Sequence, residues 1–502
     1  MLLINPKVQK LGKFFRYVPM SPPIGLGNLA GYLQSKNKNV VLVDENITPI
    51  TSESVTQLAE KLTKPYIFGI TSVTGGIKRA HEISDILKTK YPDSKVILGG
   101  IHPTVLPDET LQNPNVDIVV KGEGEETLLS LYETIKNNTD YTKLDGISYK
   151  DSSGTIVHNP AAKLPDINTI PKFPYHLFEE HKERYNLGFI ASSRGCPFNC
   201  IFCSQRSISG RKYRFMPPEK VIEMMDLLIN KYGHKFITFV DDDFIVNKER
   251  TKILCRLIQE NKFHEKACFD FQTRSDTVTE EILILMKSSG FRAIDYGIET
   301  ASERVMKIIN KGETVEEIIK AVKMTKSLGF HVSGTFIIGL PTETKKERWQ
   351  SYKLAKELDL DYVRFNNATP YPGTELYEMA KKENRLNIVG KWENLNACAT
   401  LVENPFVRTS LAYVPLTTTE KELRADILKM NLFFSLRPKR VIQLVLRRVG
   451  PVGWFSLPKR WYLNPKEIYH FTVFVLTVFL SFVKIFIDFS TDKEDIKSNE
   501  EK

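Results

Sequence analysis

Cysteine is scarce in this chain, with six in 502 residues. So few cysteines do not suggest the disulfide framework of a small secreted domain, and they favour a reducing compartment. No secretory signal precedes the opening strand-like segment MLLINPKVQK, and there is neither a short repeat nor a low-complexity tract. With 42% hydrophobic and 26% charged residues, the composition is that of a globular protein large enough for two or three domains.

Acidic residues are missing from one stretch near the end of the chain, between Ile427 and Lys466, where all charges are positive. Such a basic stretch suits nucleic acid or anionic lipid. Residues 468–489 follow it as a helical pattern that is apolar apart from one narrow polar stripe. Three alternatives are open for this helix: spanning a bilayer, lying in the interface, or docking on the protein. Trp454 and Trp461 favour attachment to the cytoplasmic membrane face.

The first part of the chain alternates short apolar runs with helical patterns. The runs are residues 2–6, 40–44, 66–71, 95–100 and 117–123. Continuous apolar strands separated by helices predict a parallel sheet covered on both faces, which is an α/β, Rossmann-like (flavodoxin-like) fold. In such sheets, ligands bind beyond the carboxyl ends of the strands.

A second alternating set follows a proline-rich connector. Its predicted strands are residues 188–193, 236–243, 268–275, 293–299, 331–339 and 362–368. Six β-α units predict a partial (β/α)6 barrel, whose chemistry belongs at the carboxyl ends of the strands. The predicted division is a first domain (1–140), a linker (141–184), the barrel (185–400), a basic helical region (401–466), and a hydrophobic helix with a polar tail (467–502).

Three of the six cysteines, Cys196, Cys200 and Cys203, lie within eight residues, just after the first predicted barrel strand. Clustered thiolates bind zinc or an iron–sulfur cluster. Structural zinc takes four ligands, commonly from two C-x-x-C pairs, whereas this loop offers three ligands and no second pair. A cubane [4Fe–4S] cluster needs one ligand for each iron, so three cysteines leave one iron open.

The segment RGCPFNCIFCS, with its C-x3-C-x2-C spacing and with Phe202 before the last cysteine, resembles the radical SAM superfamily. The resemblance implies that Cys196, Cys200 and Cys203 hold a [4Fe–4S] cluster. It also implies that the open iron binds S-adenosylmethionine (SAM), which is cleaved to a 5′-deoxyadenosyl radical.

Other SAM contacts follow from the same resemblance. One of three consecutive aspartates at the end of the second strand accepts hydrogen bonds from the SAM ammonium, and strand alternation does not select which. Glu299 holds the ribose, and Ile337 and Gly339 lie beside the adenine. Arg274 either pairs with the SAM carboxylate or forms an ion pair with Asp276 or Glu299. The predicted SAM residues are Asp241, Asp242, Asp243, Arg274, Glu299, Ile337 and Gly339. No further catalytic residue is assigned.

The first domain resembles the cobalamin-binding domain that precedes many radical SAM cores, through PPIGLGNLAGYL, GGIHPTVLPDE and DIVVKGEGEETLLSL. The predicted cobalamin residues are Thr71, Ser72, Gly99, Gly100, His102, Gly122, Glu123, Gly124 and Glu125. The segment that follows the second strand begins Asp44-Glu45-Asn46 and lacks the histidine of cobalt-ligating relatives. The protein is therefore expected to supply no lower histidine ligand, and His102 is expected to line the nucleotide-tail pocket.

Together these features predict a cobalamin-dependent radical SAM enzyme, a C-methyltransferase acting on an unactivated carbon of a hydrophobic, lipid- or isoprenoid-like substrate. Its expected partners are the cytoplasmic membrane surface and an electron donor of the flavodoxin or ferredoxin type. The alternatives are a cobalamin-dependent cyclase or rearrangement enzyme without methyl transfer, a non-catalytic membrane-tethered sensor, and an RNA-modifying enzyme that uses the basic stretch.

Overall fold

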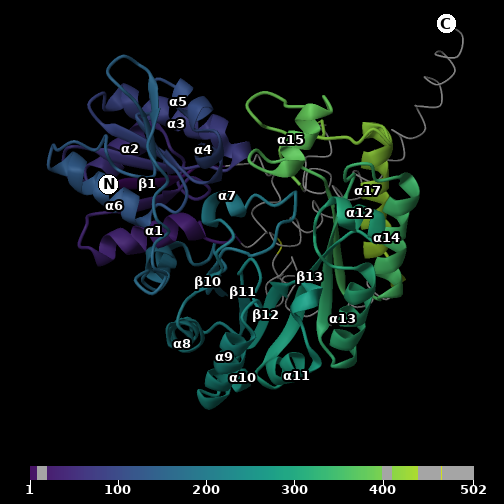
Figure 1. Ribbon diagram of the computed structural model, residues 1–502. Helices are drawn as coiled ribbons and strands as arrows, with labels where there is room; N and C mark the ends of the chain where they lie inside the picture. Colours follow the sequence, from purple (N-terminus) through teal and green to yellow (C-terminus); the bar gives the residue numbers. More distant parts are fainter. Residues whose placement is uncertain (8–19, 398–409, 439–464, 466–502) are drawn as a thin grey trace, which may run out of the picture.

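The computed structural model describes residues 1–7, 20–397, 410–438 and 465, and every structural statement below concerns these residues. Two α/β units lie next to one another, the first in purple and blue and the second in teal and green (Figure 1). Each is built on its own sheet, with seven strands in the first and six in the second.

The first sheet has the strand order β2-β1-β3-β4-β5-β6-β7, and its first five strands run parallel. These strands are β1 (Leu2–Asn5), β2 (Val41–Asp44), β3 (Ile67–Thr71), β4 (Lys95–Gly99) and β5 (Ile118–Val120). All five coincide with the apolar runs of the sequence. The predicted parallel sheet is confirmed.

Helices cover both faces of this sheet. The helices are α1 (Ile24–Ser35), α2 (Ser52–Ala59), α3 (Ile77–Lys90), α4 (Ile101–Val105), α5 (Pro107–Gln112) and α6 (Glu125–Lys136). Alternate residues of β1 point to opposite faces, so that Leu3 joins the core under α1 and α6, while Leu2 and Ile4 join the core under α2 and α3. Burial on both faces explains why the strands read as continuous apolar runs.

Two antiparallel strands extend the sheet within the predicted linker. They are β6 (Ile147–Lys150) and β7 (Ile156–His158), and β6 pairs with β5. The sequence does not predict them, because strands of four and three residues, with β7 buried on neither face, leave too little periodicity to recognise.

The second sheet has six parallel strands in the order β15-β14-β13-β12-β11-β8. They are β8 (Phe189–Ile190), β11 (Phe236–Phe239), β12 (Cys268–Thr273), β13 (Phe291–Glu299), β14 (His331–Ile338) and β15 (Tyr362–Asn367). In the described residues β8 and β15 do not pair, so the barrel is open. The predicted six-stranded partial barrel is confirmed.

Helices alternate with these strands on the outside of the barrel. They are α8 (Pro218–Asp226), which continues as the π-helical turn Leu227–Lys231, then α9 (Lys248–Glu260), α10 (Phe263–Lys266), α11 (Glu280–Ser288), α12 (Glu303–Ile308), α13 (Val315–Ser327), α14 (Lys345–Glu357) and α15 (Glu375–Lys382). Threonine caps start several of them, and Thr314 and Thr344 form reciprocal capping boxes with Glu317 and Glu347. A cluster of phenylalanines, Phe239, Phe244, Phe269, Phe271 and Phe291, fills the space between β11–β13 and their helices.

The last described helix, α17 (Glu420–Ser435), packs along the open edge of β15. The Asn431 side chain accepts a hydrogen bond from the Phe365 N–H at 3.1 Å and donates one to the Phe365 carbonyl at 2.9 Å. Asp426 accepts two hydrogen bonds from Arg348 on α14, at 2.9 and 3.0 Å. The Asn431 side chain therefore occupies the outer backbone groups of Phe365, which are otherwise available to a further strand.

The turn after β14 packs directly against α17. Gly339 has φ +84°, and an added Cβ would lie 2.7 Å from Leu423. The Gly339 N–H donates to Glu343 at 2.6 Å, while the other oxygen of this fully buried carboxyl has no partner among the described residues. Burial raises the pKa of Glu343 from 4.5 to about 8, against the opposing effects of the Gly339 hydrogen bond and Arg348.

This raised pKa predicts a pH-dependent stability. The stabilising contribution of protonated Glu343 is complete below pH 4.5 and is lost as the pH rises through about 8. Glu343→Gln keeps an oxygen acceptor for Gly339 and does not titrate. Relative to this variant, the wild type should lose up to about 4 kcal/mol of stability between pH 4 and pH 8. Melting temperatures across this range measure the effect, with exposed Glu357→Gln as the control, and parallel wild-type and Glu343→Gln profiles would contradict it.

Among the described residues, no helix is long and apolar enough to cross a membrane. The predicted hydrophobic helix and polar tail, residues 467–502, lie outside the described residues, as does most of the basic stretch. The hydrophobic helix and the membrane attachment therefore have no structural support and stay predictions from the sequence.

Candidate active site

The three clustered cysteines lie on a loop between β9 (Ser193–Arg194) and the short helix α7 (Arg206–Ser209), which β10 (Arg214–Phe215) follows. We call residues 192–206 the cluster loop. Gly195 precedes the first cysteine with φ +81°, and an added Cβ would lie 2.3 Å from the backbone oxygen of Lys212. A side chain does not fit at this position, so glycine is required for the chain to enter the loop in this way.

Cys196, Cys200 and Cys203 are free and partly buried. Burial raises the pKa of Cys196 to about 12 and also raises the pKa values of the other two thiols. Lys311 and Arg274 oppose this effect at Cys200. Among the described residues, no three side chains of His, Cys, Asp or Glu converge on a single ion. Three soft sulfur ligands on one loop fit a cubane cluster, because each thiolate then binds a different iron.

The three consecutive aspartates after β11 have different environments. Asp241 is buried and accepts hydrogen bonds from the Ser192 N–H at 2.8 Å, the Ser192 hydroxyl at 2.7 Å and the Ser193 hydroxyl at 2.6 Å. Asp241 therefore fixes the start of the cluster loop to the barrel. Both of its oxygens are engaged in this contact.

The next two aspartates remain able to accept further hydrogen bonds. Asp242 is exposed, and its carboxylate interacts with the backbone of Gly195 and the side chain of Gln205 on the cluster loop. Asp243 is buried and accepts from the Thr273 hydroxyl at 2.6 Å through one oxygen, while its other oxygen has no partner in the described part of the chain. Asp242 is the aspartate that combines an accessible carboxylate with proximity to the cysteines.

Glu299 ends β13 in a strained conformation. Its φ of +66° is rare for a residue with a side chain, and the β13–β14 register shifts between Gly297 and Glu299. A Cβ on Gly297 would lie 2.6 Å from a carboxylate oxygen of Glu299, so the glycine leaves the room that this side chain occupies. Non-glycine residues with such dihedrals are concentrated at functional sites.

Lys311 was not among the residues predicted from sequence. Its side chain is 4% exposed, and its Nζ lies 3.1 Å from Glu313 and 3.6 Å from Glu299. A buried lysine is rare unless it is paired, and this one lies at the barrel mouth beside Cys200. In the sequence, the motif Lys311-Gly312-Glu313 could have indicated this lysine, because it places two charges around a glycine in a loop at the barrel top.

Arg274 forms an ion pair with Asp276, which was one of the two roles expected for it, the other being contact with the SAM carboxylate. It donates to Asp276 at 3.0 and 2.7 Å and to the Lys311 carbonyl at 2.7 Å. Its guanidinium also lies 3.6 Å from the centre of the Phe198 ring on the cluster loop. Arg274 therefore packs against the cluster loop and stabilises it. Its charge is compensated by Asp276 and, at 3.8 Å, by Glu313.

A cavity of about 170 Å³ lies at the carboxyl ends of β1 and β3, the edge of the sheet where a ligand was expected. Its lining residues are Asn5, Pro6, Pro23, Ile24, Gly25, Leu26, Thr71, Ser72, Val73 and Gly76. Thr71 and Ser72 are thus at this cavity. Gly100, with φ +98°, packs against both, because an added Cβ would lie 2.8 Å from the Ser72 carbonyl and 2.9 Å from the Thr71 hydroxyl. The Thr71 and Ser72 hydroxyls and the Asn5 amide are the polar side-chain groups of this lining, and they could bind a polar part of the cofactor.

Other predicted cobalamin residues lie elsewhere. His102 is fully buried and packs against the Trp392 ring, with Glu109 3.6 Å from its Nε2, and it does not line this cavity. In the segment after β2, where no histidine ligand was expected, Asp44 accepts hydrogen bonds from Asn5 of β1 and from Tyr185. Glu123 and Glu125 are buried in ion pairs with the second unit.

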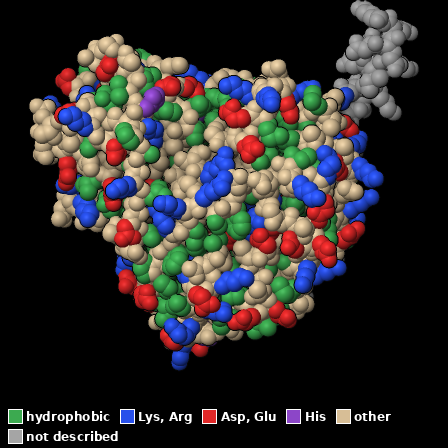
Figure 2. All heavy atoms as spheres, in the orientation of Figure 1, with side chains coloured by type: hydrophobic (Ala, Val, Ile, Leu, Met, Phe, Trp, Pro, Cys, Tyr) green, Lys and Arg blue, Asp and Glu red, His purple; other side chains and the backbone are tan. Residues whose placement is uncertain are grey.

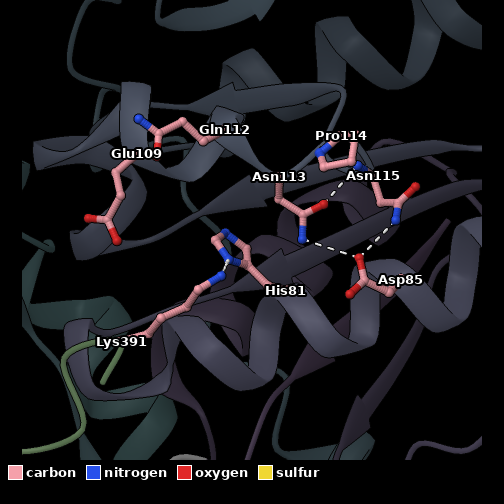
Figure 3. A pocket seen from close by; sticks show the side chains of 8 residues that line it. All are labelled: His81, Asp85, Glu109, Gln112, Asn113, Pro114, Asn115 and Lys391. Carbon is pink, nitrogen blue, oxygen red and sulfur yellow. Dashed lines mark hydrogen bonds between the residues drawn. The ribbon is translucent and has the colours of Figure 1, made fainter. Parts of the chain in front are cut away.

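Another cavity, of about 400 Å³, lies along α3 and α5 (Figure 3). Asn113 and Asn115 donate to Asp85 at 3.2 and 2.8 Å, and Lys391 faces His81. None of the predicted site residues lines this cavity.

The carboxyl ends of the two sheets meet at one junction, where α4 and α7 lie side by side (Figure 1). An added Cβ on Gly373, after β15, would lie 2.6 Å from Val105 of the first unit. Similarly, an added Cβ on Gly122, after β5, would lie 3.6 Å from the Ile208 carbonyl. The cluster loop therefore faces the edge of the first sheet that carries the predicted cobalamin residues.

Comparison with known families agrees with this arrangement. Residues 190–355 match the radical SAM superfamily, and residues 17–131 match the B12 binding domain. An uncharacterized methyltransferase of Pyrococcus horikoshii is 33% identical over 86% of this chain and 91% of its own length. The anaerobic magnesium-protoporphyrin IX monomethyl ester cyclase of Rubrivivax gelatinosus is 29% identical over 71% of this chain and 66% of its own.

Two solved structures share the fold. The radical SAM methyltransferase TsrM of Kitasatospora setae, with cobalamin and a [4Fe-4S] cluster bound, has a TM-score of 0.64 and 18% identity, covering 86% of this chain and 81% of its own. OxsB, a cobalamin-dependent SAM radical enzyme, has a TM-score of 0.63 and 21% identity, covering 89% of this chain and 61% of its own. The chain therefore belongs to the cobalamin-binding radical SAM enzymes, whose cofactors are a [4Fe-4S] cluster, SAM and cobalamin.

Proposed function

We propose that the protein is a C-methyltransferase that acts on an unactivated carbon of a hydrophobic substrate. The observation that carries this proposal is the single junction at which the cluster loop meets the carboxyl edge of the first sheet. When bound, the cluster and SAM supply a hydrogen-abstracting radical, and cobalamin supplies a methyl group. A substrate carbon at the junction would be within reach of both the radical and the methyl group.

The protein residues have distinct roles in this proposal. Cys196, Cys200 and Cys203 hold the cluster, while Thr71 and Ser72 hold the nucleotide tail. Asp242 accepts hydrogen bonds from the SAM ammonium, since Asp241 is engaged by the loop serines and Asp243 lies behind the surface. Glu299, in the room left by Gly297, holds the ribose hydroxyls.

The SAM carboxylate is assigned to Lys311 rather than to Arg274. All three nitrogens of Arg274 already donate or pair within the protein, so a new partner would have to displace Asp276 or the Lys311 carbonyl. Lys311 has three donors and two carboxylate neighbours, and it lies beside Cys200. The half-buried Ile337 and the backbone at Gly339 remain the proposed adenine platform.

Asp242→Asn tests the ammonium contact. We expect the KM for SAM to rise about 10-fold or more, because a charge-assisted hydrogen bond is lost, while iron content stays normal. Formation of 5′-deoxyadenosine at varied SAM concentration measures this effect. The matched control is Asp226→Asn, at an exposed position on α8. An unchanged KM in Asp242→Asn would remove this residue from the SAM site.

The hydrophobic class of the substrate rests on the sequence of residues 468–489. The same segment motivates the proposed location at the cytoplasmic membrane face, where a flavodoxin- or ferredoxin-type protein would supply electrons. On the visible face of the described part, Lys and Arg are interspersed with Asp and Glu (Figure 2). This surface gives no added support to the RNA-modifying alternative.

A cyclase without methyl transfer is the second candidate, because relatives at 24 to 29% identity are named as cyclases. Enzyme reconstituted anaerobically with iron, sulfide and cobalamin would be supplied with a reductant, methyl-deuterated SAM and a lipid extract. Methyl transfer predicts a product heavier by the labelled methyl group, together with 5′-deoxyadenosine and S-adenosylhomocysteine. A product that lacks the label, formed with 5′-deoxyadenosine, would support the cyclase instead.

A further inference from the structure

Two glutamates of the first unit bind the hairpin that carries the cluster loop. In this hairpin β9 and β10 pair antiparallel, which places Arg194 opposite Arg214. Arg194 donates to Glu123 at 2.8 Å and to Glu125 at 2.7 Å. Arg214 also donates to Glu123. The Ser209 hydroxyl, at the end of α7, donates to Glu123 at 2.8 Å. We call these two arginines and two glutamates the junction clamp.

The junction clamp is buried and its charges balance. The side chains of Glu123 and Glu125 are 4% exposed, and those of the two arginines are 16% exposed. Burial alone would oppose ionisation of Glu123, but Arg214 and Arg194 hold its pKa below the ordinary value. A buried pair costs desolvation energy that surface contacts do not, and breaking such a pair leaves an uncompensated charge. These contacts therefore hold the two units in a defined relative position.

The same hairpin is held from the barrel side. Asp241 binds Ser192 and Ser193, and Arg250 donates to the Ser192 hydroxyl at 2.5 Å. Arg194 is the next residue, followed by Gly195 and the first cysteine. Of the first three residues of the cluster loop, two are thus bound by the barrel and the third by the first unit.

We propose that Glu123 and Glu125 are positioning residues that act through Arg194, fixing the cluster loop against the cobalamin-carrying edge, rather than residues that bind cobalamin. Their carboxylates are occupied by arginines of the other unit and are not among the residues lining the nucleotide-tail cavity. The consequence for methyl transfer rests on the proposed function: hydrogen abstraction and methyl delivery must address one carbon, and a misplacement of about 1 Å can cost about 100-fold in rate.

The test uses the full chain loaded with cluster and hydroxocobalamin, and it needs no substrate. The variants are Glu123→Gln, Glu125→Gln and the pair together, with Glu125→Asp as the charge-conserving variant. Glu126→Gln is the control, because Glu126 is exposed and lies on α6 next to Glu125. Absorbance titration measures the Kd for hydroxocobalamin. Pulsed electron paramagnetic resonance on the reduced protein measures the distribution of distances between cob(II)alamin and the cluster.

Positioning predicts a Kd within about threefold of wild type in every variant. The distance distribution should be broadened or displaced in Glu123→Gln, Glu125→Gln and the double variant, and Glu125→Asp should lie closer to the wild type than Glu125→Gln does. A Kd raised tenfold or more with an unchanged distribution would overturn the proposal and make these glutamates cobalamin ligands. An unchanged Kd together with an unchanged distance distribution would also overturn the proposal. If the double variant does not fold, the single variants still decide. Because the readout contains no methylation step, failure of the proposed function would appear separately, as unlabelled product from wild-type enzyme.

Discussion

Replacing Cys196, Cys200 or Cys203 with serine is expected to abolish SAM cleavage, lowering 5′-deoxyadenosine formation by more than about 100-fold. Each thiolate is expected to bind a different iron, so no cysteine can compensate for another. A serine hydroxyl is a hard oxygen ligand and a poor replacement for sulfur at iron–sulfur sites. Iron and sulfide content after anaerobic reconstitution, together with the visible absorbance of the cluster, would fall in parallel with activity.

Cys268→Ser is the matched control for this prediction. Cys268 is also free and partly buried, and it begins β12, at the opposite end of the strand from the cluster loop. This variant should keep the iron, the absorbance and SAM cleavage of the wild type. Full activity in any of the three loop variants, or zinc in place of iron in protein prepared without oxygen, would contradict the assignment of the cluster.

Replacing Lys311 with methionine should lower both stability and SAM affinity. Its Nζ is the cation nearest to Glu299, and it shares Glu313 with Arg274. Removing one partner of a buried ionic network costs about 3–5 kcal/mol, because the remaining charge is left uncompensated. The melting temperature of the Lys311→Met protein measures this loss. Lys307→Met, exposed on α12, is the control and should be neutral.

Two further variants separate stability from ligand binding at Lys311. In Lys311→Met with Glu299→Gln, the isolated carboxylate is also removed, so most of the stability should return. Because Glu299 is itself a proposed SAM residue, this double variant is compared by melting temperature only. Lys311→Arg keeps the charge and should recover part of the SAM affinity. Equal SAM affinity in Lys311→Met and the wild type would leave this lysine a purely structural role.

The strands and the cluster loop were predictable because their signals are local. Apolar runs bounded by turn residues predicted β1–β5 and the barrel strands, and the cysteine spacing marked the loop. The three aspartates could not be ranked from sequence, because their difference depends on Ser192 and Ser193, about 50 residues earlier. The arginine partners of Glu123 and Glu125 lie about 70 to 90 residues away, in another domain. Contacts of that kind depend on tertiary packing and leave no periodic trace.

The two hydrogen bonds between Asn431 and β15 have a practical consequence when the chain is shortened. A version that stops after residue 438 keeps α17 and removes the basic and hydrophobic C-terminal segments. A version that stops near residue 400 uncovers the outer backbone groups of Phe365, which then become available to a strand from another molecule. The shorter protein should self-associate during purification, even though every cysteine of the cluster loop is still present.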